Sequence, residues 1–550
     1  MKGNSYIPFM VRRGDGSTLS LDFTSMSALD SRFTFSRASQ GTFINSQGLL
    51  RYADHNLFTN TAWLGSSLPT NWLLLIGTGT TTWNADGSVT MSAATSQRPA
   101  IYQTGITVSP GIAYTYGFVA TNVSGSPTVA DIVNSGLVGE TYAVNGTTVA
   151  GSTVVQNNDV VSCTFTPTST TASPRIGPGC RANVSNMSVT ASRPQMNIGT
   201  ALAAYVLNTA LTSYYAPRFD YDPSTLSAKG LLIEGSTTNR VLYSQTFATT
   251  GAGTPHWTEQ HITRNSTNNT DPAGGSTALR VTASNPTGTL LNNVNLASAQ
   301  RTFSIYLRRV SGTGNVELTL DGGTTWTAQS ITSSWARYSI TATSTAHVGV
   351  RIVENGDSIE LWGAQVEDGA AASSYIQTGT STVQRAGDVC SLTGSNFSSW
   401  YGTPTAFTVV LEGTVVSAGA YTRILNFSSG ANTVSGIPNF NIGVPAAFSN
   451  RPFMNSYIVS ANNVDTYVPL AGAVTNGVSF KLAARCQAAL HRITRGTGLS
   501  GSSSYNGFPA GLANLYFGAT DGAYQTSTHY ARVKFFPSGI PDAQMDTLAT

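Results

Sequence analysis

The sequence predicts an all-β protein in which several antiparallel β-sandwich or jelly-roll domains follow one another in tandem. Many short runs alternate apolar and polar residues, as in residues 303–308 and 316–320, and a period of two is typical of half-buried antiparallel strands. Turn-forming pairs such as Asp86-Gly87 and Asn145-Gly146 recur between these runs and favour tight hairpins. Because a single core rarely grows beyond roughly 250–300 residues, the 550 residues indicate three or four domains.

The composition predicts a neutral, hydroxyl-rich surface. Only 10% of the residues are charged and 40% are hydrophobic, whereas a typical chain has about 25% charged residues. A net charge of +3 without a basic run lacks the electrostatic footprint that nucleic-acid binding requires. The regular return of apolar residues argues against disorder. No segment approaches 18 apolar residues and the N-terminus lacks an apolar leader core, so we expect neither a membrane span nor a signal peptide.

The four cysteines do not form a recognisable motif. They show no C-x-x-C spacing and are too sparse to staple a small secreted domain. We expect buried free thiols, and a bridge between the two closest cysteines stays open as an alternative. The residues are Cys163, Cys180, Cys390 and Cys486.

Changes in pattern divide the chain into blocks. A boundary near Asn56 opens one β-sandwich that runs to about residue 205, a second strand-rich block ends at about residue 388, and a third runs from 389 to 550. The first two blocks open alike, since residues 56–63 lead to Trp72 and residues 241–247 lead to Trp257; this predicts an imperfect module repeat of roughly 150 residues. The last block ends in a strand and a short helix that begins near Pro541-Asp542.

Three elements resemble a recurrent pattern in the tail and virion-surface proteins of tailed bacteriophages. They are Thr-Phe-Ser-Arg-Ala-Ser at residues 34–39, Pro-Arg-Phe-Asp-Tyr-Asp-Pro at residues 217–223 and Lys-Gly-Leu-Leu-Ile-Glu at residues 229–234. In that family the first and third elements usually sit close together, whereas here a whole sandwich separates them. The simplest account is an insertion into one small β-domain. The motif residues are Arg37, Arg218, Asp220, Asp222, Gly230 and Glu234.

The resemblance extends to the following blocks. Residues 359–369 and 374–378 are similar to the end of a carbohydrate-binding-module-like jelly roll, with Trp362, Gln365, Glu367 and Tyr375 as its motif residues. The last block looks like a concanavalin A/laminin-G sandwich. The resemblance therefore implies a split N-terminal attachment domain (1–56 plus 206–238), a jelly roll (239–388) and a laminin-G-like sandwich (389–550). Composition and periodicity alone predict the inserted β-sandwich (57–205).

The resemblance implies a structural protein on the surface of a phage particle. We expect a tail fibre or spike-type appendage, a homotrimer by family analogy, that docks on other virion proteins and binds host-surface glycans. One alternative is a capsid-bound head fibre or decoration protein. A second is a polysaccharide depolymerase of the tailspike kind, but that architecture needs a short-period repeat that the sequence does not show.

Aromatic side chains are the candidate sugar platforms, because a ring stacks on the apolar face of a pyranose while nearby amides bind its hydroxyls. The candidates are Trp326, Trp335, Tyr401 and Tyr524, although a strand tryptophan such as Trp335 also suits a core position. Related sandwiches often hold calcium at their rim through Asp and Asn oxygens. Asp521 and Asn514 would be the ligands here, but they lack a matched cluster, so no cofactor is predicted.

We expect no enzymatic activity. Asp220 and Asp222 lie close in sequence, but their neighbours Arg218 and Pro223 favour a turn held by salt bridges over a glycosidase pair. Residues 256–261 contain two histidines and a glutamate at a spacing that fails the helical H-E-x-x-H zinc pattern. The G-x-S-x-G elbow and the phosphate-binding loop are also missing from the sequence.

Overall fold

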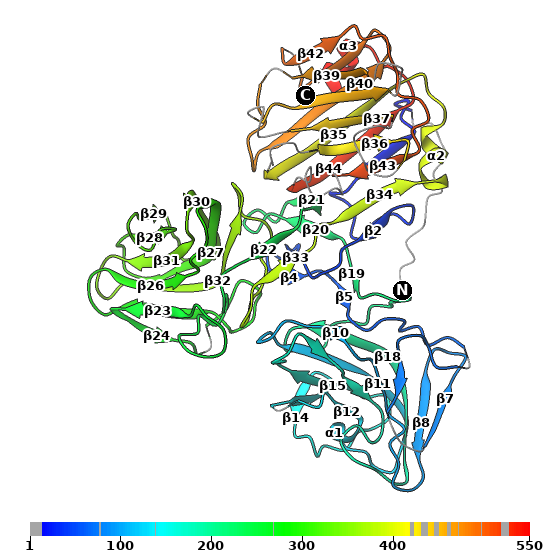
Figure 1. The fold of residues 1–550 in the computed structure, drawn as a ribbon, viewed down its shortest axis with the longest axis vertical. Coiled ribbons are helices and arrows are strands. Elements are labelled where there is room, and N and C mark those ends of the chain that lie inside the picture. The colour runs from blue at the N-terminus through cyan, green and yellow to red at the C-terminus, as the bar shows by residue number, and fades with distance from the viewer. Residues whose placement is uncertain are drawn as a thin grey trace.

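The protein is described here from a computed structural model. It describes residues 14–550, except 66, 76–78, 138, 268, 418–422, 431–437, 445–449, 459–463, 471, 497 and 519–526. The predicted all-β fold is confirmed, since the described part consists of antiparallel sheets with three short helices. Figure 1 shows three sandwich modules that extend from a central junction.

The inserted sandwich occupies the lower part of Figure 1. Its larger sheet has the order β14-β13-β15-β11-β18-β8-β7, with bounds Thr147–Val149, Thr141–Val144, Val160–Phe165, Tyr114–Ser124, Met187–Ile198, Val89–Ala93 and Thr80–Trp83. The facing sheet, β12-β17-β9-β6, comprises Val133–Asn134, Arg175–Ile176, Ile101–Tyr102 and Leu73–Leu74. A small pair, β10 and β16, adds Ile106–Thr107 and Thr171–Ala172. All of these strands come from one continuous stretch of chain.

The jelly roll consists of two five-stranded sheets. The first, β23-β26-β31-β28-β29, comprises Trp257–Gln260, Gly288–Asn293, His347–Ile352, Val316–Thr319 and Thr327–Gln329. The second, β24-β25-β32-β27-β30, comprises Ile262–Asn265, Leu279–Ala283, Ser358–Asp368, Ala299–Ser311 and Ala336–Ser344. This module is also continuous in sequence.

The C-terminal sandwich takes strands from distant parts of the chain. One sheet has the order β20-β21-β44-β35-β40-β41-β42, with β1 also paired to β44; the bounds are Arg218–Tyr221, Ala228–Ile233, Ser527–Phe536, Ala406–Ser417, Ser479–Gln487, His491–Thr494, Ser500–Ser503 and Leu19–Asp22. The other, β2-β34-β43-β36-β37-β38-β39, comprises Thr34–Ser36, Val389–Thr393, Asn514–Phe517, Arg423–Ser428, Asn439–Gly443, Phe453–Ile458 and Val464–Pro469.

The pairings of β1, β2, β20 and β21 differ from the predicted N-terminal domain. We expected residues 1–56 and 206–238 to form a β-domain of their own, but β1 and β21 pair with β44 and β2 pairs with β34. Only short two-stranded pieces stay outside the large sheets: β3–β4 (Thr42–Ile44 and Leu50–Tyr52), β5–β19 (His55–Asn56 and Tyr214–Tyr215) and β22–β33 (Thr237–Asn239 and Val383–Arg385). The physical reason is that Leu19, Leu21, Leu231 and Ile233 bury their side chains in the C-terminal core.

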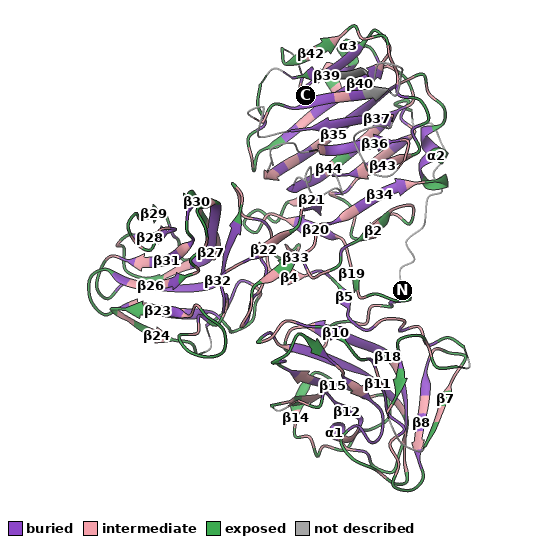
Figure 2. Cartoon of the chain, viewed as in Figure 1, coloured by how far each residue is buried: buried purple, intermediate pink, exposed green. Residues whose placement is uncertain are grey.

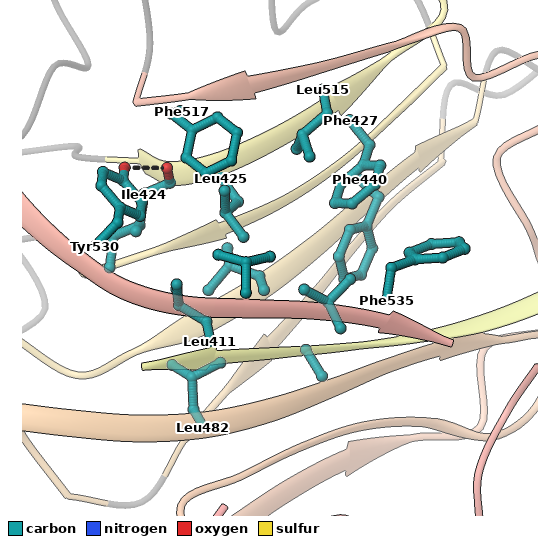
Figure 3. Packing of buried hydrophobic residues seen from close by; sticks show 14 of the residues in the cluster. Leu411, Ile424, Leu425, Phe427, Phe440, Leu482, Leu515, Phe517, Tyr530 and Phe535 are labelled. Carbon is teal, nitrogen blue, oxygen red and sulfur yellow. Dashed lines mark hydrogen bonds between the residues drawn. The ribbon is translucent and has the colours of Figure 1, made fainter. Parts of the chain in front are cut away.

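Each module has a core of its own, visible as the buried inner strands in Figure 2. In the C-terminal sandwich, Figure 3 shows aliphatic and aromatic side chains that meet between the two sheets. Phe407 lies edge-on to Phe440, with ring centroids 4.9 Å apart, and the Tyr530 hydroxyl donates to the Ile424 carbonyl at 2.5 Å. Burying a side chain of this size contributes roughly 1.5–3 kcal/mol. The strands β1 and β21 place such side chains in the same core, so these strands from far upstream are an integral part of it.

The two module openings that look alike in sequence have the same role in the structure. At the start of each module, a fully buried asparagine forms hydrogen bonds both with the last long strand of the module and with the segment that leaves the module. Asn56 Nδ2 donates to the carbonyls of Pro194 and Val206 at 2.9 Å each. Asn239 Nδ2 donates to those of Ala364 and Ile376 at 3.0 and 2.7 Å.

A glutamine completes each of these ties. Gln195 Oε1 accepts from the amide of Val206 at 3.0 Å, and Gln365 Oε1 accepts from the amide of Ile376 at 2.7 Å. The tryptophans also match, since Trp72 packs edge-on against Trp63 and Trp257 against Phe247, with centroid distances of 5.0 and 4.9 Å. This shared pattern agrees with the predicted module repeat.

The helices are short. They are α1 (Val129–Ile132), α2 (Ser395–Tyr401) and α3 (Asp542–Leu548). The predicted C-terminal helix is confirmed as α3, with Pro541 at its N-cap in an extended conformation. In the described part of the chain, no helix has the length and apolar character of a membrane span.

Candidate functional site

Five charged side chains form a buried ion cluster where the three modules meet. We call Arg37, Arg218, Glu234, Arg385 and Asp388 the ion cluster; their side chains are 0–1% exposed. Arg218 lies at its centre, with Nη1 2.5 Å from Glu234 Oε2 and Nη2 2.5 Å from Asp388 Oδ2. Arg37 Nη1 contacts Asp388 Oδ1 at 2.8 Å, and Arg385 Nη1 lies 3.5 Å from Glu234 Oε2.

Strand ends place these five residues together. Arg37 follows β2, Arg218 starts β20, Glu234 follows β21, Arg385 ends β33, and Asp388 lies just before β34. The backbone amide of Glu234 donates to Asp388 Oδ2 at 2.8 Å, and the amide of Asp388 donates to the Glu234 carbonyl at 2.9 Å. The cluster therefore joins both sheets of the C-terminal sandwich to the linker that leaves the jelly roll.

The electrostatics of the cluster favour charged carboxylates. Although burial opposes ionisation, the Arg385 and Arg218 guanidinium groups hold the pKa of Glu234 well below its usual range. Arg218 and Arg37 likewise lower the pKa of Asp388 against the effect of burial. Burial, together with the neighbouring Arg218, lowers the pKa of Arg37 to about 10. Removing one partner from a buried pair leaves an uncompensated charge, which typically costs 3–5 kcal/mol.

The jelly-roll motif residues surround this cluster. Ser374 Oγ donates to Glu234 Oε2 at 2.6 Å, and the Ser374 amide donates to Glu234 Oε1 at 2.8 Å. Gln365 Nε2 donates to Glu367 Oε2 at 2.8 Å. Burial raises the pKa of Glu367, while hydrogen bonds from Ser373 oppose this rise.

Aromatic packing holds the adjoining edge of the jelly roll. Trp362 and Tyr375 pack together with centroids 4.7 Å apart, and the Tyr375 hydroxyl contacts Ser244 Oγ at 2.6 Å. Both rings are buried, at 3% and 1% exposure. The predicted motif residues of the jelly roll thus form part of the joint between modules.

Gly230 is required by the way β21 meets β44. Its φ is +92°, in the left-handed region that favours glycine, and a Cβ there would lie 2.1 Å from the Tyr530 carbonyl oxygen. Any side chain would therefore separate the two strands.

The two aspartates weighed as a glycosidase pair have separate structural roles. Asp220 Oδ1 accepts from the Ile44 amide at 2.6 Å, and Asp220 Oδ2 lies 2.7 Å from His529 Nε2, beside a cleft of about 220 Å³. Asp222 accepts from Ser224 and Thr225 in the turn that follows β20. Those hydrogen bonds lower the pKa of Asp222, the bond from Ser224 most of all.

The three candidate sugar platforms that the structure describes have different surroundings. Trp326 and Trp335 are half-buried, and one face of each ring is covered by an arginine, with Arg351 Cζ 4.5 Å from the Trp326 centroid and Arg308 Cζ 5.0 Å from that of Trp335. The prediction for Tyr401 is wrong: its side chain is 5% exposed and stacks on Phe397 in the C-terminal core. Tyr524 lies outside the described residues.

Among the described residues, those considered as calcium or zinc ligands do not form a metal-binding cluster. Across the residues that the structure describes, no group of three His, Cys, Asp or Glu side chains is arranged to hold a metal ion. Asn514 Nδ2 donates to the Gly430 carbonyl at 2.8 Å, and Asp521 lies outside the described residues. His256 stacks on Tyr243, and Glu259 forms an ion pair with Arg264. All four cysteines are buried free thiols, so Cys163 and Cys180 are not bridged.

Sequence reasoning missed Arg385, Asp388 and Ser374 as members of the junction. The sequence did contain a signal for one of them. Arg37, Arg218 and Glu234 were singled out as motif residues, and they carry two positive charges against one negative charge. Buried charges require partners, so a search for a further carboxylate close to a module boundary would have found Asp388.

Comparisons with known proteins add no identification. No family model matches the chain, and no curated protein matches it. Among solved structures, the chain is similar to a Trypanosoma rangeli sialidase in complex with the inhibitor DANA, with 8% identity, a TM-score of 0.23 and 94% of each chain covered. Similarity at that level carries no argument about fold or activity.

Proposed function

We propose that the chain is a structural protein on the surface of a tailed-phage particle, a fibre or spike-type appendage that presents its sandwiches to host-surface glycans. The observation that carries this proposal is the buried ion cluster, which joins strands from residues 34–36, 218–233 and 389–393 at one point. Three of its members, Arg37, Arg218 and Glu234, belong to the motifs that resemble virion-surface proteins. These motif residues would therefore serve to hold the modules of a scaffold together.

A fixed joint suits a protein that displays binding surfaces. A particle outside the cell must keep its shape without chaperones, so resistance to unfolding is needed. A buried ion pair sets one geometry, because every displaced arrangement leaves a charge unpaired. Several weak sites on a multimeric appendage then give useful avidity.

The protonation states of the buried acids support a structural role over hydrolysis. A glycosidase needs two carboxyl groups that flank the substrate, one of them with a raised pKa. Glu234 and Asp388 are committed to arginines, and their pKa values are lowered. Glu367 has a raised pKa, but its side chain is buried against Ser373 and Gln365.

Immunoelectron microscopy tests the proposal. Antibodies raised against the purified chain should label intact phage particles from lysates that contain it, at the tail for a fibre or spike and at the capsid for a head fibre. Particles that lack the chain, while it stays in the soluble fraction, would contradict the proposal.

A second assay tests the absence of catalysis. Purified protein is incubated with capsule and lipopolysaccharide of the host, and released reducing ends are measured. We expect binding without release. Release of oligosaccharides above the level of a heat-denatured control would replace the scaffold proposal with the depolymerase alternative.

A further inference from the structure

A pocket of about 670 Å³ lies where the N-terminal segment, the inserted sandwich and the end of the jelly roll meet. We call it the junction pocket. Its volume falls within the roughly 300–1,000 Å³ of typical small-molecule sites. A second pocket of about 560 Å³ is also lined by Phe35 and Tyr214, so the two pockets adjoin at these residues.

The lining of the junction pocket is aromatic and neutral. The lining includes several tyrosines, glutamines, serines and threonines, and Arg37 is the only charged residue among those that line it. The Arg37 guanidinium is already bound to Asp388 Oδ1, the Ser39 carbonyl and the Ala216 carbonyl. The neutral polar lining includes Tyr52, Tyr114, Tyr214, Gln377, Gln384 and Thr107.

Some of these polar groups are already engaged, and others remain free to bind a ligand. The Tyr52 hydroxyl donates to Gln377 Oε1, and the Tyr114 hydroxyl accepts from the Ser109 amide. By contrast, no hydrogen bond in the described part of the chain engages the side chain of Tyr214, Gln384 or Thr107. Tyr214 is also 37% exposed, so its ring is accessible.

This chemistry matches an uncharged sugar. A phenol ring stacks on the apolar face of a pyranose, and amide and hydroxyl groups bind the sugar hydroxyls. An acidic sugar would require a free cation to balance its charge, and the lining offers none.

The walls of the pocket are held in place before any ligand arrives. The Ala386 amide donates to Ser39 Oγ at 2.7 Å, and the Thr380 amide donates to the Pro110 carbonyl at 3.1 Å. The Tyr215 ring stacks on His55 with centroids 6.0 Å apart and an interplanar angle of 11°. A preformed site loses less conformational entropy on binding.

We propose that the junction pocket binds a neutral oligosaccharide, with Tyr214 as the stacking ring and Gln384 as the hydrogen-bonding amide. This inference rests on the glycan-binding part of the proposed function. It places the site at the junction between modules, away from the tryptophans of the jelly roll.

Isothermal titration calorimetry on the full chain tests the inference. The probes are maltohexaose, cellohexaose and chitohexaose as neutral ligands and oligo-sialic acid as the acidic one. We expect at least one neutral probe to bind, with Tyr214→Ala and Gln384→Ala each weakening the affinity by about tenfold or more, or about 1.4 kcal/mol, and Tyr214→Phe keeping it within about threefold.

Trp326→Ala tests the competing candidate site, because it removes a candidate sugar-stacking ring from the jelly roll. We expect this variant to bind within about twofold of the unchanged chain, and thermal unfolding of every variant verifies that it is folded. Binding lost in Trp326→Ala but kept in Tyr214→Ala would overturn the junction site while leaving glycan binding intact. Binding of oligo-sialic acid alone, or of no probe, would also overturn it. Failure of the virion role is decided separately by the particle labelling.

Discussion

The inserted sandwich and the C-terminal sandwich are completed in opposite ways. The strands of the inserted sandwich, β6 to β18, all lie within residues 73–198. The C-terminal sandwich needs β1, β2, β20 and β21, which precede it by up to several hundred residues. The sheets of the first module are therefore complete within one segment of the chain, whereas the sheets of the second are completed by strands from far upstream.

Isolated fragments should reveal this difference most strongly. We expect a fragment of residues 54–216 to fold, and a fragment of residues 389–550 to lack a cooperative thermal transition by circular dichroism. The second fragment loses six core side chains, each worth roughly 1.5–3 kcal/mol on burial, which together match the whole stability of a typical domain, about 5–15 kcal/mol. They are Leu19, Leu21, Phe23, Phe219, Leu231 and Ile233. Cooperative unfolding of 389–550 alone would contradict this account.

A substitution in the ion cluster should have the next largest effect on the stability of the C-terminal sandwich. Asp388→Asn removes the negative charge between Arg37 and Arg218 and should lower the free energy of unfolding by about 3–5 kcal/mol. The control is Lys534→Gln, which removes the exposed pair with Asp15 and should cost about 0–1 kcal/mol. Urea denaturation at pH 7 measures both. Equal effects of the two variants would show that burial does not strengthen the cluster.

The sequence allowed the fold class to be predicted, but not the membership of the sheets. Alternation and turn pairs are local signals, and they identify strands wherever they occur. The pairing of β1 with β44 depends on contacts between Leu19 and Phe535, and no local pattern encodes a partner at that distance. The predicted N-terminal domain was wrong for this reason.

The candidate site shows the same limit. Arg37, Arg218 and Glu234 could be singled out because their motifs are distinctive, whereas Asp388 carries no motif and is defined only by its partners. Tyr401 was misplaced because its burial depends on how a short helix packs against the core. The structure instead places Ser395–Tyr401 in α2, which buries Phe397, Trp400 and Tyr401 against the core.

The two repeated modules offer a paired test. Asn56→Ala and Asn239→Ala each leave buried carbonyl and amide groups without partners, so we expect each to lower stability by roughly 2–3 kcal/mol. Asn183→Ala removes an exposed side-chain bond to Ser96 and should change stability by less than about 0.5 kcal/mol. Calorimetry that resolves the module transitions checks whether each variant affects its own module. A loss confined to one of the two would break the parallel between them.

Mild acid should act on the boundary of the inserted sandwich. Burial lowers the pKa of His55 to about 4, and its Nε2 accepts from the Ile198 amide at 2.9 Å. Between about pH 4 and pH 6.5 the unfolded chain binds a proton that the folded chain does not, so stability is fully present above pH 6.5 and falls as the pH is lowered. The expected loss is about 2 kcal/mol between neutral pH and pH 5.

The choice of pH range separates this effect from that of the ion cluster. Glu234 and Asp388 have lowered pKa values, so their contribution is lost only below about pH 4. His491, whose pKa burial also lowers, contributes in the same direction as His55. The variant His55→Gln should therefore flatten the dependence of the unfolding free energy on pH between 6.5 and 5, and an unchanged slope would remove His55 from the explanation.

The pairing of β1 with β44 has a consequence during synthesis. At a ribosomal rate of roughly 5–20 residues per second, the first strand waits on the order of tens of seconds for its partner to emerge. All strands of the inserted sandwich and of the jelly roll lie between β1 and β44 in the chain, so we expect their sheets to form in the meantime. The strand β1 has only four residues and ends in Asp22, so it offers little edge for wrong pairing. Its short length and its charge should therefore limit mispairing of the nascent chain until the last strands leave the ribosome.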